Sequence, residues 1–148
     1  MRKRRTLRYE SLADALRDAE RLSNGYRRAA NWSLGQICDH LGTAMRYSRN
    51  GFPSQWPKPL QALARFVAMR RIQADKIMRL RFPSPIGSPR ELPALRGIEY
   101  LAEGIECFQS AGADCAPHIV FGNMSRQEWT QFHLWHCAHH LSFLIPEN

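Results

Sequence analysis

Histidine is the residue type whose spacing first suggests chemistry in this chain. Four of the six histidines fall within one short stretch, namely His133, His136, His139 and His140. His136 and His140 are four positions apart, so on a helix they share one face with Cβ atoms about 5–6 Å apart. From that separation two imidazoles can bind one metal ion at about 2.0–2.1 Å. Histidines that line a helical bundle through hydrogen bonds are the alternative interpretation.

The other residues on the helix face of His136 and His140 help to decide between metal binding and hydrogen bonding. They form an aromatic stripe: Trp129, Phe132 and Phe143. Both imidazoles are therefore expected to face the interior, where a polar group without a partner costs on the order of 1–3 kcal/mol. A metal ion is one such partner, so the stripe favours metal binding.

His40 supplies a third inward imidazole from a different segment. Three protein ligands and an open position are typical of catalytic rather than structural zinc sites. The glutamate of a zinc peptidase motif is absent after the first histidine, because Cys137 stands there, so no peptidase is indicated. The predicted metal ligands are His40, His136 and His140.

The other two histidines of the last helix receive different roles. His139 lies about 100° round the helix from its neighbours. We expect it to flank the ligands or to contact a dimer partner. His133 is the substitute ligand if the helical register differs from the predicted one.

Acidic and cysteine side chains near the ligands are weaker candidates. Asp39 precedes His40 but points about 100° away on the helix, and Glu128 is expected to cap the last helix. Neither is assigned a catalytic role, and the catalytic residues stay unknown. Cys38 and Cys137 are close to ligands in sequence, but a buried free cysteine usually behaves as a small hydrophobic residue.

Two tryptophans near helix starts, Trp32 and Trp129, have two open interpretations. They could wall the metal pocket. Packing of a helix-start tryptophan against the bundle is the interpretation that we favour.

Helical periodicity predicts the elements that position these residues. Capping-box patterns begin helices at Ser11, Ser33 and Ser125, each with an acidic or amide residue three positions later. The predicted helices span residues 11–24, 33–50, 60–81 and 98–110, and a last one runs from Ser125 until Pro146 stops it.

Two proline-rich segments connect the helices. Residues 52–59 contain three prolines and cannot continue a helix. Residues 82–96 contain four more and are long enough for a crossover that makes non-sequential helices neighbours. Because we find no strand alternation of useful length, we expect an all-α bundle of four long helices with a shorter helical piece.

Length and composition limit the function further. The 148 residues suit a single domain, 1–148, in which residues 1–8 form a basic and flexible tail. No apolar run approaches about 18 residues, so we expect neither a membrane span nor an export signal. Four cysteines without a CxxC pair indicate free thiols and a cytoplasmic location. The net charge of +8, carried by 18 Arg and 3 Lys, keeps a nucleic-acid partner open.

Three segments carry a resemblance to a known superfamily. They are residues 31–41 (NWSLGQICDHL), residues 117–129 (PHIVFGNMSRQEW) and residues 136–143 (HCAHHLSF). In this order they resemble the DinB-like superfamily of metal-binding four-helix bundles, in a branch catalogued as a domain of unknown function. Ser142 and Ile119 stand where that pattern has glutamine and proline, and these departures concern loop and substrate contacts rather than the metal ligands.

The resemblance implies a divalent metal on His40, His136 and His140, a bundle with a long crossover, and a homodimer. Characterised members include thiol-dependent transferases and isomerases. Three imidazoles also suit several transition metals, of which we expect zinc or nickel ahead of copper and iron.

The expected function is that of a metal-dependent enzyme, a thiol-dependent transferase or a hydrolase of a small-molecule substrate. A bound ion would lower the pKa of a water or hold a substrate thiol as thiolate, and the sequence does not separate these chemistries. A non-catalytic metal- or ligand-binding bundle is the alternative. We do not favour a nucleic-acid-binding module, because no helix-turn-helix or zinc-finger pattern is present. No membrane partner is expected.

Overall fold

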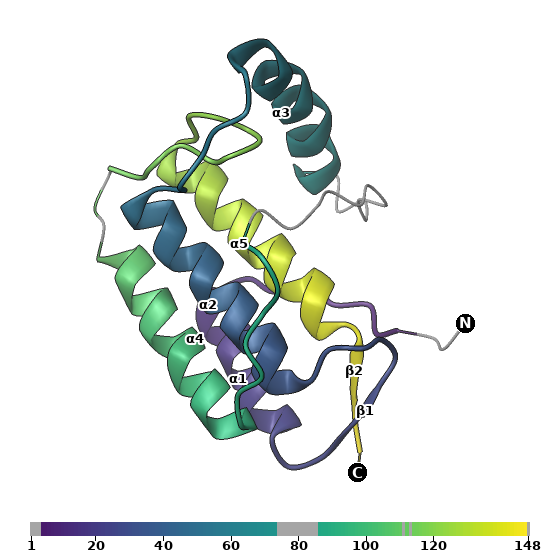
Figure 1. Cartoon of the computed structure of the whole chain (residues 1–148). Helices are drawn as coiled ribbons and strands as arrows, with labels where there is room; N and C mark the ends of the chain where they lie inside the picture. The colour runs from purple at the N-terminus through teal and green to yellow at the C-terminus, as the bar shows by residue number, and fades with distance from the viewer. Residues whose placement is uncertain (1–3, 74–85, 111, 113, 148) are drawn as a thin grey trace.

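The computed structural model describes residues 4–73, 86–110, 112 and 114–147 (Figure 1). Its helices are α1 (Leu12–Leu22), α2 (Leu34–Asn50), α3 (Lys58–Gln73), α4 (Ala94–Gln109) and α5 (Arg126–Leu141), and its strands are β1 (Tyr26–Arg28) and β2 (Leu144–Pro146). The described chain is therefore mostly helical, as the periodicity predicts. No helix in these residues is long and apolar enough to cross a membrane.

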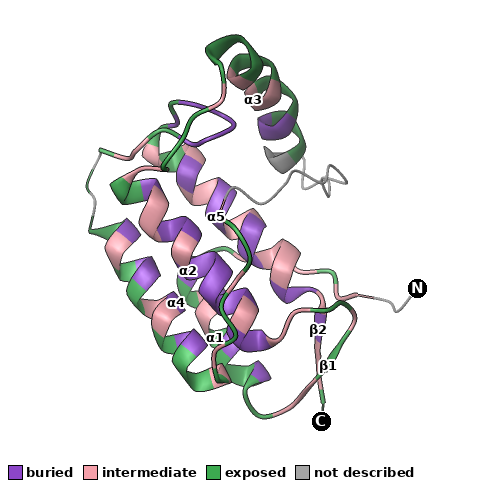
Figure 2. Ribbon diagram, viewed as in Figure 1, coloured by how far each residue is buried: buried purple, intermediate pink, exposed green. Residues whose placement is uncertain are grey.

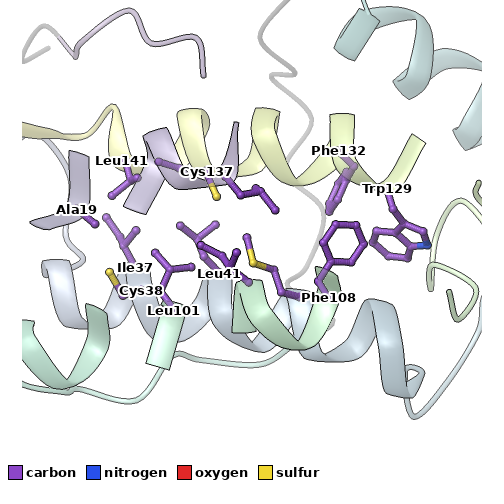
Figure 3. Close-up of a cluster of buried hydrophobic side chains, with 14 of the residues drawn as sticks. Ala19, Ile37, Cys38, Leu41, Leu101, Phe108, Trp129, Phe132, Cys137 and Leu141 are labelled. Atoms are coloured by element: carbon purple, nitrogen blue, oxygen red, sulfur yellow. The ribbon is translucent and has the colours of Figure 1, made fainter. Parts of the chain in front are cut away.

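Four helices pack side by side around one core. Figure 1 shows α2, α4 and α5 as neighbouring rods with α1 behind them, and α1 contacts both α4 and α5. The buried side chains in Figure 3 fill the space between α5 and the α2 and α4 pair, from Leu141 at one end to Trp129 at the other. This core determines which face of α2 packs towards which face of α5.

The α2 and α4 helices approach at glycines. A Cβ on Gly97 would lie 2.8 Å from the Cα of Gly35, and one on Gly104 would lie 2.8 Å from the carbonyl oxygen of Gly42. The residue numbers rise together along both helices, so α2 and α4 run parallel. Non-sequential helices are therefore neighbours, which the length of the proline-rich connection permits.

Helix α3 stands outside this packing, beyond one end of α5 (Figure 1). Ala68 and Met69 are buried, while the outward face is largely exposed in Figure 2 and carries Leu63 at 64% exposure. Arg65 bonds both carboxylate oxygens of Glu128, at 2.7 and 2.9 Å, which attaches α3 to the start of α5.

Several predicted helix boundaries differ from those observed. Helix α3 begins at Lys58, and residues 74–81 of the predicted helix, like residues 82–85 of the predicted crossover, lie outside the described residues. Helix α4 begins at Ala94 rather than near Ile98. Pro93 is its N-cap residue and makes no side-chain cap, and proline is tolerated at the start of a helix, where the N–H groups have no intrahelical partner. These differences leave the ligand-bearing helices unaffected.

The two short strands are a feature that the sequence analysis did not predict. Strand β1 pairs antiparallel with β2, which places Tyr26 opposite Pro146. The last helix consequently ends at Leu141 instead of continuing towards Pro146. The Tyr26 hydroxyl accepts the backbone N–H of Leu34 at 3.0 Å, so the sheet ties the start of α2 to the end of α5.

The basic N-terminal segment is attached to the bundle at Arg5. Its guanidinium bonds both carboxylate oxygens of Asp18, at 2.9 and 2.7 Å, and its backbone N–H donates to the carbonyl of Ser142 at 2.9 Å. Tyr9 donates to the same carboxylate at 2.5 Å. At Arg5, therefore, the segment that we expected to be a flexible tail packs against α1 and the end of α5.

Candidate metal centre

The capping boxes set the register of both helices that carry predicted ligands. The Ser33 hydroxyl accepts the N–H of Gln36 at 3.2 Å, and the Gln36 amide oxygen accepts the N–H of Ser33 at 2.9 Å. Ser125 and Glu128 make the same pair of bonds at the start of α5. Both helices therefore begin where the sequence predicts, and their ligand residues keep the predicted spacing.

The structure brings the three predicted ligands together. His40 comes from α2, while His136 and His140 lie one turn apart on α5. Their ring centroids are 4.6–5.0 Å apart, and one ligand nitrogen of each lies within 4.8 Å of the others. We call this cluster the histidine triad; it could hold a metal ion.

The donor atoms of the triad fit a metal. The Nε2 atoms of His40 and His136 face each other at 3.1 Å. A proton on one of these nitrogens would let it donate to the other, whereas with both protons on Nδ1 both Nε2 lone pairs are free to bind one cation. The Nδ1 atoms of these two rings are buried without a hydrogen-bond partner, and Nε2 is the atom that each of the two rings presents to the other.

Burial keeps these imidazoles uncharged. It lowers the pKa of His40 to about 4, although the Asp39 carboxylate acts in the opposite direction. Burial also holds the pKa values of His136 and His140 well below 6.5, and the neighbouring imidazoles lower them further. Metal ligation requires neutral histidine, so the triad is in the required state at neutral pH.

Trp32 forms a wall of the triad. Its indole stacks on His140 at 5.4 Å and an interplanar angle of 14°, and it lies 5.1 Å from the ring of His40. Trp129 is fully buried, and its indole N–H donates to the carbonyl of Ala116 at 3.1 Å. The packing interpretation that we favoured is therefore confirmed for Trp129, whereas Trp32 both packs against the core and borders the triad.

His133 and His139 lie outside the triad. The Nε2 of His133 is 3.0 Å from the hydroxyl of Ser48, deep in the core, so His133 is not the substitute ligand. The ring of His139 meets that of His140 edge-on at 5.0 Å and stacks on Trp135 at 5.4 Å. The prediction that His139 flanks the ligands is confirmed.

Comparison with known families adds an assignment at this point. One family model matches residues 1–147. The chain belongs to DUF1569, a family described as a protein of unknown function. The comparisons with curated proteins and with solved structures found no match. Membership in DUF1569 assigns no activity, so the function has to be argued from the site.

In this DUF1569 protein, the acidic neighbours of the triad are engaged elsewhere. Asp39 is buried and accepts three hydrogen bonds from Arg90, one from its backbone N–H at 2.8 Å and two from its guanidinium at 2.9 and 2.6 Å. Glu128 caps α5 and pairs with Arg65. As expected, neither carboxylate is placed to act as a base at the triad.

The two cysteines nearest to the ligands in sequence are packed in the core. Cys38 and Cys137 are fully buried and free. Burial raises the pKa of Cys38 to about 12 and raises that of Cys137 as well. Both thiols stay protonated at neutral pH, which agrees with their expected structural role.

Sequence reasoning missed two residues of the site. Trp135 stacks on His136 at 6.4 Å and an angle of 14°, but it stands off the aromatic stripe that drew attention to the ligands. Arg90 comes from the proline-rich connection, where no periodic pattern indicates a partner for Asp39. Only the folded chain shows that this connection crosses α2 beside His40.

Proposed function

We propose that this protein is a metal-dependent enzyme that binds a divalent transition metal, zinc or nickel, on His40, His136 and His140. The observation that carries the proposal is the convergence of three neutral imidazoles from two helices, with ligand nitrogens within 4.8 Å of one another. Three protein ligands leave a coordination position open for water or substrate, which is the arrangement of catalytic sites.

A divalent ion bound there would supply a Lewis acid that lowers the pKa of a water or of a substrate thiol. The residues of the chain supply the surroundings. The imidazoles stay neutral through burial, and Trp32 shields one side of the triad from water. No carboxylate of the described residues bonds to a triad imidazole, because Asp39 is held by Arg90. The chain therefore contributes orientation and a dry environment rather than a carboxylate base.

Two reaction classes remain compatible with this site. Hydrolysis would use an activated water, and group transfer would use a thiolate from a low-molecular-weight thiol. The resemblance to DinB-like proteins supports the transferase, together with the homodimer that the same resemblance implies.

An activity screen of the metal-loaded protein tests the proposal. We expect transfer of a low-molecular-weight thiol to an electrophile, or hydrolysis of a small ester or amide, with loss of about 10²-fold or more in His136→Ala. His133→Gln is the matched control, because it changes a buried histidine outside the triad. Equal activity of His136→Ala and the unchanged protein would refute a metal-dependent reaction, and metal binding without turnover would favour the non-catalytic bundle.

The partner proposals have separate tests. A nucleic-acid partner would bind with an affinity that falls by orders of magnitude between about 50 and 200 mM salt. We expect no binding of a mixed DNA or RNA pool at low salt. Sedimentation equilibrium tests the homodimer, and a monomer at all concentrations would contradict it.

A further inference from the structure

Two half-buried tryptophans flank the histidine triad and have no part in metal binding. Trp32 precedes the cap of α2 and contacts the rings of His40 and His140. Trp135 lies on α5 and contacts the rings of His136 and His139. Each indole thus touches a different pair of imidazoles.

The two indoles contact different members of the triad. His136 lies one turn before His140 along α5, and Trp135 meets His136 together with Phe132, whose ring is 6.1 Å from that of Trp135. Trp32 meets the triad at His140 instead. The segment before α2 and helix α5 therefore each present an indole next to the triad.

Aromatic rings border the ligands, and the neighbouring Asp39 carboxylate is bonded to Arg90. His40 and His136 are only 5% and 8% exposed, whereas Trp32 and Trp135 are half-buried. Small-molecule sites in proteins are typically lined by apolar and aromatic side chains with few polar groups. The triad with its two indoles has this composition.

We propose that Trp32 and Trp135 form an aromatic cradle that selects a substrate whose metal-binding group is attached to a planar ring. The inference rests on the proposed function, because the metal fixes the donor end of the substrate. Aromatic pairs gain affinity from stacked or edge-to-face contact beyond the area that they bury, by up to about tenfold. Imidazole ligands are uncharged and no carboxylate of the described residues bonds to them, so an anionic donor atom on the substrate would balance the charge of a divalent ion.

Three hydroxamates that differ only in the attached group test the cradle: acetohydroxamate, cyclohexanecarbohydroxamate and benzohydroxamate. The protein is loaded with Co²⁺, and binding is followed by visible absorption and by tryptophan fluorescence, with metal content checked after each titration. We expect benzohydroxamate to bind about tenfold more tightly than acetohydroxamate and several-fold more tightly than the saturated ring. Trp32→Leu and Trp135→Leu should each reduce this preference.

A matched tryptophan elsewhere serves as the control. Trp56 lies in the connection before α3, and Trp56→Leu should keep the full preference for benzohydroxamate. If Trp32→Leu does not fold, Trp32→Phe should fold and keep much of the preference, because it retains a planar ring.

The outcomes separate the inference from the proposed function. If Co²⁺ does not bind, both are wrong. If Co²⁺ binds but the three hydroxamates have equal affinity, or the saturated ring binds as tightly as the planar one, the cradle is refuted and the metal site stands. Retention of the full preference in both tryptophan variants would also refute the cradle.

Discussion

At the scale of single residues, the histidines owe their properties to burial rather than to charged partners. The charge of the Asp39 carboxylate would raise the pKa of His40, yet burial lowers that pKa to about 4. Burial likewise lowers the pKa values of His118 and His133 to about 3. The folded protein therefore keeps these side chains neutral under conditions in which the unfolded chain would protonate them.

This difference predicts a pH-dependent stability of the metal-free protein. The folded-state pKa values lie below the unfolded value of about 6.5, so the unfolded state binds more protons between about pH 6.5 and 3. The free energy of unfolding should be highest above pH 6.5 and fall as the pH is lowered through this window, on the order of 1–2 kcal/mol per buried histidine by pH 5. Urea unfolding in EDTA at pH 7.5, 6.0 and 5.0 measures it. Constant stability over that range would show that the histidines are not buried as described.

The ion pair beside His40 gives a second prediction at this scale. Asp39 is 4% exposed and accepts three hydrogen bonds from Arg90. Asp39→Ala should lower the free energy of unfolding by about 1–3 kcal/mol, because the bonds that hold the connection against α2 are lost. Glu103→Ala is the control, since Glu103 pairs with Arg46 at the surface and such pairs contribute about 1 kcal/mol or less. Equal losses in urea unfolding would contradict the account of this pair.

How far these residues could be predicted from sequence depended on whether their partners were local. The spacing of His136 and His140 predicted two members of the triad, and the inward imidazole expected of His40 was the third. The role of Trp32 depends on the path of the chain before α2, and that of Arg90 on a long connection. Neither path leaves a periodic pattern in the sequence.

At the scale of elements, the close approach of α2 and α4 sets the geometry behind the triad. Gly35 and Gly97 meet with no room for a side chain, and Gly35 also lies under the backbone of Leu92, whose carbonyl oxygen would be 1.8 Å from a Cβ at that glycine. The proline-rich connection before α4 and α4 itself thus both pack closely against α2, the helix that carries His40. This contact holds α2 in place opposite α5.

Adding a methyl group at this contact between α2 and α4 should therefore destabilise the protein. Gly97→Ala is expected to lower the free energy of unfolding by about 1–3 kcal/mol, because the backbones of α2 and α4 cannot move apart without disturbing the core. Glu106→Ala changes an exposed position of the same helix and should stay within about 0.5 kcal/mol of the unchanged protein. Thermal or urea unfolding compares the two variants. A neutral Gly97→Ala would mean that the helices are less tightly packed than the structure shows.

Elements could also be predicted from the sequence where the interactions that define them are local, and not where their partners are distant in sequence. Ser11, Ser33 and Ser125 cap helices in the structure as the capping boxes predicted, because a capping box is a local interaction. Strands β1 and β2 have three residues each and pair across most of the chain. So short a strand shows no alternation, and its partner cannot be read from neighbouring residues.

At the scale of the whole molecule, the triad joins two helices that are far apart in sequence. The strands already tie the start of α2 to the end of α5, and a metal on the triad would add a second link that exists only in the folded state. A ligand that binds only the folded state stabilises it by about 2.7 kcal/mol at 100 times its Kd.

We therefore expect zinc to raise the thermal unfolding temperature of the protein. EDTA should reverse the effect, and His136→Ala should show none of it. Calorimetry with and without zinc measures the shift. An equal shift in His136→Ala would mean that zinc binds elsewhere.

The most direct test of the central claim is elemental analysis of the purified protein without a histidine tag. The account predicts about one transition-metal ion per chain, lost in His40→Ala, His136→Ala and His140→Ala and retained in His133→Gln, with circular dichroism confirming that each variant is helical. A chain that cannot be loaded with metal, or folded triad variants that keep it, would contradict the assignment of the triad as a metal centre.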